Sequence, residues 1–220
     1  MPTTRSYNDR CPIARALDAV GERWALLVVR ELLLGPQRFS DLRRALPGAS
    51  TNMLTDRLRE LEARGIVRRR ALPPPAASSV YELTGRGRQL ELVLDALGSW
   101  GFGEPPPECG SLGATPVLLF LRGSLRANPA TPQVTLELQL GERVWTVVGD
   151  GGDVEVQPHP SASADVALRT DPETLNALVF DPRGLDAALA DGAAEVDGDV
   201  EALRRVLESA AVGARSPAGS

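Results

Sequence analysis

Apolar residues between positions 49 and 64 recur at the spacing of a helix. They fall at i, i+4 and i+7, which places them on a single stripe. The stripe consists of Leu54, Leu58 and Leu61. Ser50 and Thr51 precede it and can cap the first turn, and Gly65 stands where a helix end needs a left-handed residue. The pattern predicts a helix that buries its leucines and exposes a polar face.

A shorter helix and a basic hairpin flank this helix. The shorter helix is expected to begin with Ser40 as its N-cap and to end at Pro47-Gly48. Ile66–Arg70 has the pattern of a strand and Val80–Leu83 that of its partner, with the proline-rich loop Leu72–Ser79 between them. A helix, a turn, a second helix and a hairpin in this order predict a winged helix-turn-helix.

Three other stretches before residue 103 predict helices. Ile13–Val20 has one apolar face, whereas Arg23–Leu34 is apolar nearly all round, as expected of a helix at the centre of its domain or at a dimer interface. Thr84 is expected to cap a long helix that continues to about Trp100. Its apolar residues exceed what one face needs, so it packs against a second subunit or against the C-terminal half. The surplus residues are Leu92, Val93 and Ala96.

The pattern changes after Gly103. Residues 104–113 form a stiff, proline-rich linker. Residues 134–140 alternate between apolar and polar, which is typical of a half-buried strand. The remaining elements are a helix over 116–126, strands over 143–148, from 154, over 164–169 and over 194–196, and helices over 172–180, 183–190 and 199–211. This order predicts an α+β domain with an antiparallel sheet.

The fold class is therefore α+β in two domains. We expect a winged helix-turn-helix domain at 1–103, the linker at 104–113 and an α+β domain at 114–213.

Charge divides the chain in the same place. Residues 1–103 hold 16 arginines against 11 acidic residues, a net charge of +5, and residues 104–220 hold 8 against 18, a net charge of −10. A basic first half suits a polyanionic partner such as DNA, and an acidic second half does not.

The sequence offers no catalytic constellation. The single histidine, His159, lies between two prolines, and the two cysteines, Cys11 and Cys109, are too few for a disulfide framework. We therefore expect no enzyme, no metal and no cofactor. Residues 1–10 lack the apolar core of a secretory signal, and no apolar run reaches the length of a membrane span, so we expect a cytoplasmic protein without a membrane partner.

Seven motifs follow one another in the first half of the chain. These are Cys11-Pro12-Ile13, Gly21-Glu22-Arg23-Trp24, Arg38-Phe39-Ser40-Asp41-Leu42, residues 54–62, residues 65–69, Val80-Tyr81-Glu82-Leu83-Thr84 and Leu97-Gly98-Ser99-Trp100-Gly101. Together, and in this order, they resemble the HxlR-type winged helix regulators of bacteria from about Cys11 to Gly101. The resemblance implies a homodimeric transcriptional regulator.

The second half resembles the sterol carrier protein domain over about residues 113–212. The motifs are residues 164–171, Thr174–Leu178 and Gly192–Asp199, followed by Leu203 and Leu207. The resemblance implies an apolar tunnel between sheet and helices. We expect Phe120, Trp145 and Phe180, the bulkiest side chains of this half, to line such a pocket.

The DNA-binding residues are expected on the outer face of the second helix, at the helix starts and on the basic strand. Short polar side chains can contact base edges in a major groove, and arginines can contact phosphates. The candidates are Arg38, Ser50, Thr51, Asn52, Thr55, Asp56, Arg57, Arg59, Arg68, Arg69 and Arg70.

Cys11 is the one candidate for a reactive thiol. It precedes Pro12 at the start of a helix, where backbone N–H groups favour a thiolate, and some HxlR-type regulators sense oxidants through a cysteine at this position. The alternative is a thiol that only fills space.

Three hypotheses follow. The first is a regulator, expected to be a repressor, that binds an inverted-repeat operator as a homodimer and holds an apolar effector in its second domain. The second is a redox-responsive regulator that acts through Cys11, with the second domain as a dimerisation module. The third is a lipid carrier whose winged helix has become a protein-contact module.

Overall fold

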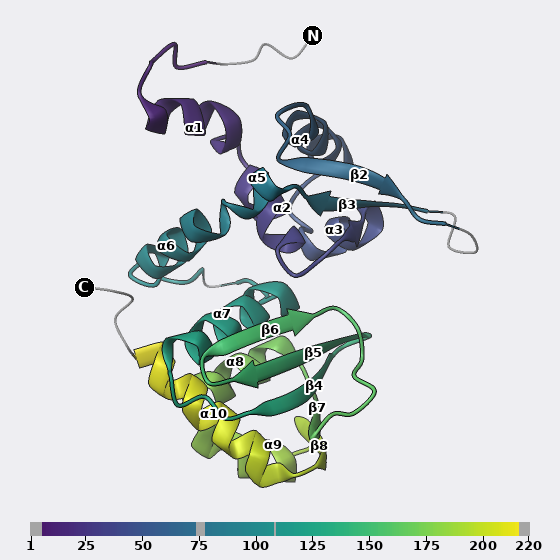
Figure 1. Ribbon diagram of the computed structural model, residues 1–220, viewed down its shortest axis with the longest axis vertical. Coiled ribbons are helices and arrows are strands. Elements are labelled where there is room, and N and C mark those ends of the chain that lie inside the picture. Colours follow the sequence, from purple (N-terminus) through teal and green to yellow (C-terminus); the bar gives the residue numbers. More distant parts are fainter. Residues whose placement is uncertain (1–5, 74–77, 108, 216–220) are drawn as a thin grey trace. The chain divides into compact units, whose positions relative to one another are not determined.

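The computed structural model describes residues 6–73, 78–107 and 109–215, except for the side chain of Arg215. The chain folds as two compact units, Met1–Pro105 and Pro106–Ser220 (Figure 1). Residues 74–77, within the predicted loop Leu72–Ser79, lie outside the described residues.

The first unit is mainly helical. Its helices are α1 (Pro12–Val20), α2 (Ala25–Leu32), α3 (Phe39–Ala45), α4 (Thr51–Ala63), α5 (Gly85–Arg88) and α6 (Glu91–Gly101). Its strands β1 (Gln37–Arg38), β2 (Val67–Ala71) and β3 (Ser79–Leu83) form an antiparallel sheet in the order β1-β3-β2. Helix α2 contacts α3, α4, α6 and β3, and Val28 and Val29 are fully buried, so this helix is the centre of the unit.

The predicted second helix of the helix-turn-helix is confirmed in its start, its stripe and its end. Ser50 caps α4, because its Oγ accepts the Met53 N–H at 3.2 Å. The three leucines of the stripe are buried. Gly65 adopts φ +65°, the left-handed conformation that ends the helix.

Ser40 is not the N-cap of the preceding helix, and that prediction is wrong. The N-cap of α3 is Arg38, two residues before Ser40, so the helix begins at Phe39, and the N–H of Arg38 donates to Asp41 Oδ2 at 3.2 Å. The reason lies in the tertiary structure. Arg38 belongs to β1, which pairs with β3, so the chain passes directly from a strand into the helix.

The prediction of one helix from Thr84 to Trp100 is also wrong. Thr84 Oγ1 does accept the Gly87 N–H at 3.1 Å, but the helix that it caps, α5, ends at Arg88, and α6 begins at Glu91. A Cβ at Gly87 would lie 2.2 Å from the carbonyl oxygen of Ile66, so only a glycine lets α5 approach the residue that precedes β2 this closely. The chain then makes a turn at Gln89 and Leu90 before α6 begins, so the apolar pattern continues across two helices rather than one.

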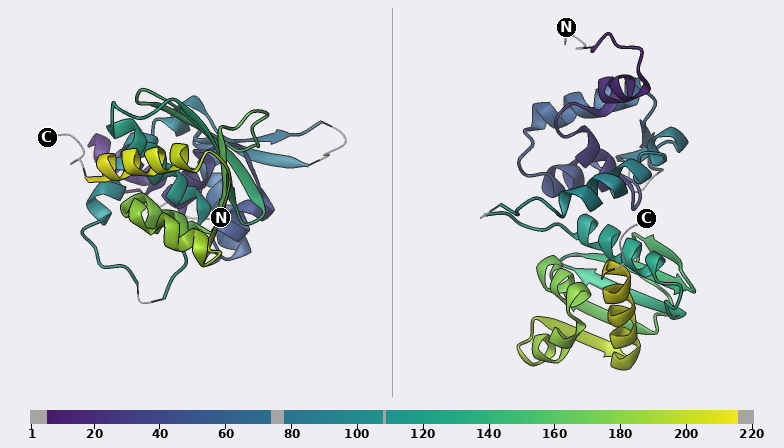
Figure 2. Two further views of the ribbon diagram at one scale, coloured as in Figure 1. Left: turned by 90° about the horizontal axis from the view of Figure 1, so that it is seen from below. Right: turned by 90° about the vertical axis from the view of Figure 1, so that its left-hand side faces the viewer.

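The second unit is an α+β sandwich of one sheet and one helical layer. Its strands are β4 (Val134–Leu140), β5 (Arg143–Asp150), β6 (Asp153–Gln157), β7 (Val166–Thr170) and β8 (Ala194–Gly198), in the order β6-β5-β4-β7-β8. Its helices are α7 (Ala114–Ala127), α8 (Pro172–Phe180), the 3-10 turn η1 (Pro182–Gly184), α9 (Leu185–Ala190) and α10 (Val200–Arg215). Helices α7, α8 and α10 pack together over one face of the sheet (Figures 1 and 2).

The sheet is mixed, which corrects the expectation of an antiparallel one. Strands β4 and β7 are parallel, and the other neighbouring pairs are antiparallel. The segment between β6 and β7 crosses the sheet on the side opposite the helices. Thr146 Oγ1 donates to the carbonyl of His159 at 2.8 Å, and the N–H of Ser161 donates to Glu137 Oε2 at 3.0 Å. This crossing returns the chain to the end of the sheet at which β6 begins. Strand β7 therefore runs in the same direction as β6, which is also the direction of β4.

The helix-facing side of the sheet forms the core of the second unit. Leu138 pairs with Trp145 on β5 and with Leu168 on β7, and all three are buried. None of the helices in the described ranges is both long and apolar enough to cross a membrane.

Candidate nucleic-acid interface

The outer face of α4 is polar and accessible. Thr51, Asn52, Asp56 and Arg59 are exposed, as is the capping residue Ser50 at the start of the helix. The leucine stripe points inward and fixes the rotation of the helix, so these side chains occupy the opposite surface. An exposed helix with short polar residues in its first turns has the size and chemistry to enter a major groove.

Four predicted contact residues of α4, Thr55, Asp56, Arg57 and Arg59, make contacts within their own helix. Arg57 is bound to Glu60 and only 16% of its side chain is exposed. Thr55 donates its hydroxyl to the carbonyl of Thr51 at 2.8 Å, which leaves its lone pairs as acceptors. Arg59 lies 3.8 Å from Asp56, and both side chains are exposed. Asn52 and Arg59 are therefore better placed for a groove than Arg57.

Arg43 holds the turn between the two helices, a role that the sequence did not indicate. Its Nη1 donates to the carbonyl of Ala49 at 2.8 Å, immediately before the Ser50 cap. Position 43 carries one of several arginines in a basic segment, so no local signal separates it from the others. Its bond links α3 to the start of α4.

The basic strand β2 places its arginines on two faces of the hairpin. Arg68 pairs with Glu82 and Arg69 with Tyr81 in the β2–β3 register. Arg68 and Arg70 therefore lie on the face that carries Glu82, and Arg69 lies on the other. The N–H of Arg69 donates to Glu62 Oε1 at 3.2 Å, which ties β2 to α4. Arg38, also exposed, lies on β1 beside β3.

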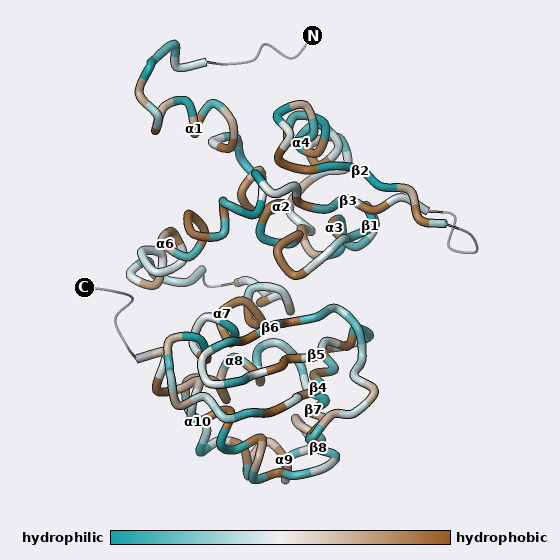
Figure 3. The backbone as a smooth tube through the Cα atoms, viewed as in Figure 1, coloured by the Kyte–Doolittle hydropathy of each residue, from teal (hydrophilic) through white to brown (hydrophobic). Residues whose placement is uncertain are grey.

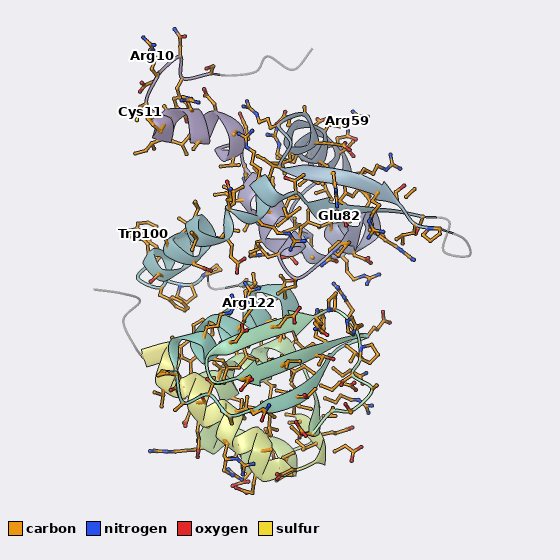
Figure 4. All side chains as sticks on the ribbon, viewed as in Figure 1. Arg10, Cys11, Arg59, Glu82, Trp100 and Arg122 are labelled. Atoms are coloured by element: carbon orange, nitrogen blue, oxygen red, sulfur yellow. The ribbon has the colours of Figure 1, made fainter. Side chains whose placement is uncertain are left out.

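The sequence of this hairpin contains one acidic residue, Glu82, which is labelled in Figure 4. Its side chain is buried. Its Oε1 accepts from Arg68 Nε at 2.7 Å and its Oε2 from Arg70 Nε at 3.1 Å. Burial alone would raise the pKa of Glu82, but the hydrogen bonds and charges of Arg70 and Arg68 outweigh it and hold the pKa below its usual value. The carboxylate is therefore ionised at neutral pH.

Helix α6 is an apolar helix with no buried residue. Leu92 is 77% exposed and Trp100 68%. Figure 3 colours part of the α6 backbone brown, which marks hydrophobic residues. Other exposed apolar side chains of the unit lie before or within α1, on α4 and after α6. They are Tyr7, Ile13, Leu17, Met53 and Phe102. A monomer does not need so much apolar surface in water.

Cys11 is exposed at the start of α1 (Figure 4). Its N–H donates to Asp9 Oδ1 at 2.9 Å. The second cysteine, Cys109, is also exposed and free.

The three side chains proposed for an apolar pocket come from three elements, Trp145 from β5, Phe120 from α7 and Phe180 from α8. Trp145 is 1% exposed and lies on the helix-facing side of the sheet. Phe120 stacks on Phe180 with ring centroids 4.9 Å apart, which joins α7 to α8. Phe180 is 43% exposed, so this pair lies at the surface of the helical layer rather than deep in the core.

A groove of about 370 Å³ lies on the opposite side of the sheet. It is lined mostly by polar residues, Glu137, Gln139, Arg169, Glu195 and Asp197, with Ala167, Leu168 and Val196. Arg169 donates to Gln139 at 3.0 Å and to Glu195 at 3.0 Å. The groove therefore differs in lining and position from an apolar tunnel between sheet and helices. Within the described ranges, no group of three or more His, Cys, Asp or Glu side chains is arranged to hold a metal ion.

A helix-turn-helix whose second helix exposes a polar face, followed by an arginine-bearing hairpin, defines a winged helix DNA-binding protein. Comparison with known proteins gives the family. The model of the HxlR-like helix-turn-helix family matches residues 19–107, and the chain belongs to that family. The model of the SCP-2 sterol transfer family matches residues 123–208, so the chain joins an HxlR-like module to an SCP-2 domain.

Relatives of the first unit are transcriptional regulators. The HTH-type transcriptional regulator YvaP of Bacillus subtilis is 38% identical over 96 residues, which cover 43% of this chain and 89% of YvaP. The regulator YodB of the same organism is 37% identical over 101 residues, 44% of this chain and 90% of YodB. The structure of the redox regulator HypR in its oxidised form is 35% identical, covers 44% of this chain and all of HypR, and has a TM-score of 0.42.

Proposed function

We propose that this HxlR-type regulator is a repressor that binds an inverted-repeat operator as a homodimer. The observation that carries the proposal is the exposed polar face of α4, with Asn52 and Arg59, in the same unit as the arginine strand β2. Helix α4 enters the major groove, and the arginines of β2 contact phosphates. A protein that acts on operator DNA works where the DNA is, and we assign it to the cytoplasm.

The exposed apolar surface of α6 supports the homodimer. An apolar helix whose residues are all at least partly exposed gains stability by packing against the same helix of a second copy. Two-fold symmetry then places two α4 helices about one duplex turn apart, which is why we propose an inverted repeat.

For the second unit we propose an apolar small-molecule effector. The SCP-2 family is named for sterol transfer, and the helical layer here has a part-exposed aromatic pair, Phe120 and Phe180, at the seam between α7 and α8. We propose that a ligand enters between these two helices to reach the core beside Trp145. It alters DNA binding only if it binds the DNA-competent and incompetent states with different affinities.

Binding of the full-length protein to duplexes from its own upstream region tests the DNA-binding proposal. We expect the protein to bind one inverted repeat more tightly than a random duplex. We also expect its affinity for both duplexes to fall as the salt concentration rises. Affinity that does not depend on salt or sequence would favour the lipid carrier with a protein-contact module instead. Mass spectrometry of small molecules that copurify with the protein tests the effector.

The second candidate is a redox-responsive regulator, favoured by the exposure of Cys11 at a helix start. In that case the second unit serves as a dimerisation module. Operator binding with and without a thiol oxidant separates the two candidates. Loss of the response in Cys11→Ser, and its retention in Cys109→Ser, is the outcome expected of the redox candidate.

A further inference from the structure

The hairpin of the first unit contains a carboxylate shared by two arginines. Glu82 lies on β3, the central strand of the sheet, and its side chain is 11% exposed. Arg68 stands directly opposite in the β2–β3 register, and Arg70 stands two residues further along the same face. Each arginine uses a different oxygen of the carboxylate.

Both hydrogen bonds use the same nitrogen of the guanidinium. Arg68 and Arg70 donate through Nε, at 2.7 Å and 3.1 Å. A guanidinium has five N–H donors, so the two amino groups of each arginine stay available to another acceptor. The side chains of Arg68 and Arg70 are 67% and 45% exposed, so solvent or a ligand can reach them. The Nε of each guanidinium is therefore held by Glu82, and the two amino groups are free to bind a ligand.

The arrangement has two opposite effects on an anionic partner. The carboxylate cancels one of the two positive charges, which weakens long-range attraction to a polyanion. The carboxylate also orders the side chains of Arg68 and Arg70 before any ligand binds. Because these side chains then lose less rotamer entropy on binding, the free-energy cost of binding is lower. The geometry favours the second effect, because the side chain of Glu82 is only 11% exposed, whereas those of Arg68 and Arg70 are 67% and 45% exposed.

We propose that Glu82 is a positioning residue that presents Arg68 and Arg70 as a pair to the DNA backbone. The proposal rests on the proposed DNA-binding function. Arg69, on the other face of the strand, is not part of the pair. The pair is separated by two residues along a strand, about 6.8 Å, a distance suited to neighbouring phosphates of one DNA strand.

The test is the salt dependence of DNA binding by the full chain, measured for an operator duplex and a random duplex. Glu82→Gln keeps the shape of the side chain, but its amide nitrogen cannot accept a hydrogen bond from an arginine. We expect about a tenfold loss of affinity for both duplexes, the scale of a long side chain that must be ordered on binding. We also expect the salt slope to fall by about 0.9, the value for one lost phosphate contact.

Glu62→Gln is the matched control. It removes the same charge next to the same strand, but Glu62 accepts from the backbone N–H of Arg69 and not from the side chain of either paired arginine. We expect its DNA affinity to equal or exceed that of the unchanged protein. Affinity that is unchanged or raised in Glu82→Gln would show that Glu82 only offsets charge, and would overturn the proposal.

A second measurement distinguishes the positioning role of Glu82 from a purely structural one. In a chain that already carries Arg68→Ala and Arg70→Ala, the further change Glu82→Gln should leave both affinity and salt slope unchanged. A further loss there would mean that Glu82 acts through the fold of the hairpin, which also overturns the proposal. If the unchanged protein shows no salt-dependent DNA binding, it is the proposed function that fails.

Discussion

The indole ring of Trp24 lies directly against Gly48. A Cβ built on Gly48 would stand 2.8 Å from Cη2 of Trp24 and 3.3 Å from Cζ2. Trp24 itself adopts φ +75°, a left-handed conformation that a tryptophan seldom takes, at the N-cap of α2. The ring thus joins the start of the central helix to the turn that precedes α4.

Gly48→Ala should destabilise the first unit. The added methyl group forces the Trp24 ring or the turn to move, and overpacking of this kind costs about 1–3 kcal/mol. Urea unfolding of the full chain, followed by the fluorescence of its tryptophans, measures the loss. Gly85→Ala is the control, because a Cβ there meets nothing within 4 Å. Equal stability of the two variants would contradict the close contact.

Asn52→Ala should lower affinity for the operator more than for random duplex. Asn52 is exposed in the first turn of α4, and an asparagine that pairs with adenine in bidentate fashion contributes about 1–3 kcal/mol of discrimination. Anisotropy titrations with both duplexes at one salt concentration give the two losses. If they are equal, Asn52 does not contact a base.

Leu97→Glu should convert a dimer into a monomer. Leu97 is 47% exposed on α6, so the substitution leaves the core of the unit intact but buries a charge if two copies of α6 meet. We expect the sedimentation coefficient of a monomer and weak operator binding, with the thermal midpoint little changed. Val212→Glu, an exposed apolar residue of α10, is the control. A dimer that survives Leu97→Glu would place the interface elsewhere.

Asp171 should make the stability of the second unit depend on pH. Its carboxylate caps α8 and accepts from the Thr174 N–H at 2.8 Å and the Thr174 hydroxyl at 2.7 Å. The backbone hydrogen bond from Thr174 is the main cause that lowers the pKa of Asp171. Because the folded pKa is depressed, the stabilisation is present above the unfolded value, about 3.9, and is lost as pH falls through the folded value.

Asp171→Ala should therefore cost about 1 kcal/mol at pH 7, as the loss of a helix N-cap does, and progressively less in acid. Urea unfolding at pH 7 and at pH 3 measures the difference. Asp171→Asn is the comparison, since its side-chain oxygen can cap the helix without a charge. A cost in Asp171→Ala that is the same at both pH values would contradict the role of the carboxylate.

Local patterns predicted many of the elements. The Ser50 cap, the three-leucine stripe and Gly65 define α4 through interactions within one segment of chain, which composition and spacing reveal directly. The same holds for β4, whose alternation matches its burial, and for α8, whose bounds agree with the prediction. The polar face of α4 follows from the stripe, so Thr51 and Asn52 were accessible to sequence reasoning.

Roles that depend on how the chain turns and how its strands pair could not be predicted in this way. Arg43 donates to the carbonyl of Ala49 only because the turn between α3 and α4 brings that carbonyl to it. Glu82 is a common residue in a strand, and only the β2–β3 register puts it between two arginines. The two-residue strand β1 carries no period of its own and forms because β3 offers it an edge.

The sequence by itself determined what a short stretch of chain can decide alone, namely the caps, the helical and strand periods, the division into a basic and an acidic half, and the family resemblances. The tertiary structure decided that α3 begins at Phe39, that two helices rather than one follow Thr84, and that β7 runs parallel to β4. The physical reason is the range of the interactions. Caps and stripes involve residues within two turns of one another, whereas strand pairing and close glycine contacts join segments whose separation along the chain leaves no local trace.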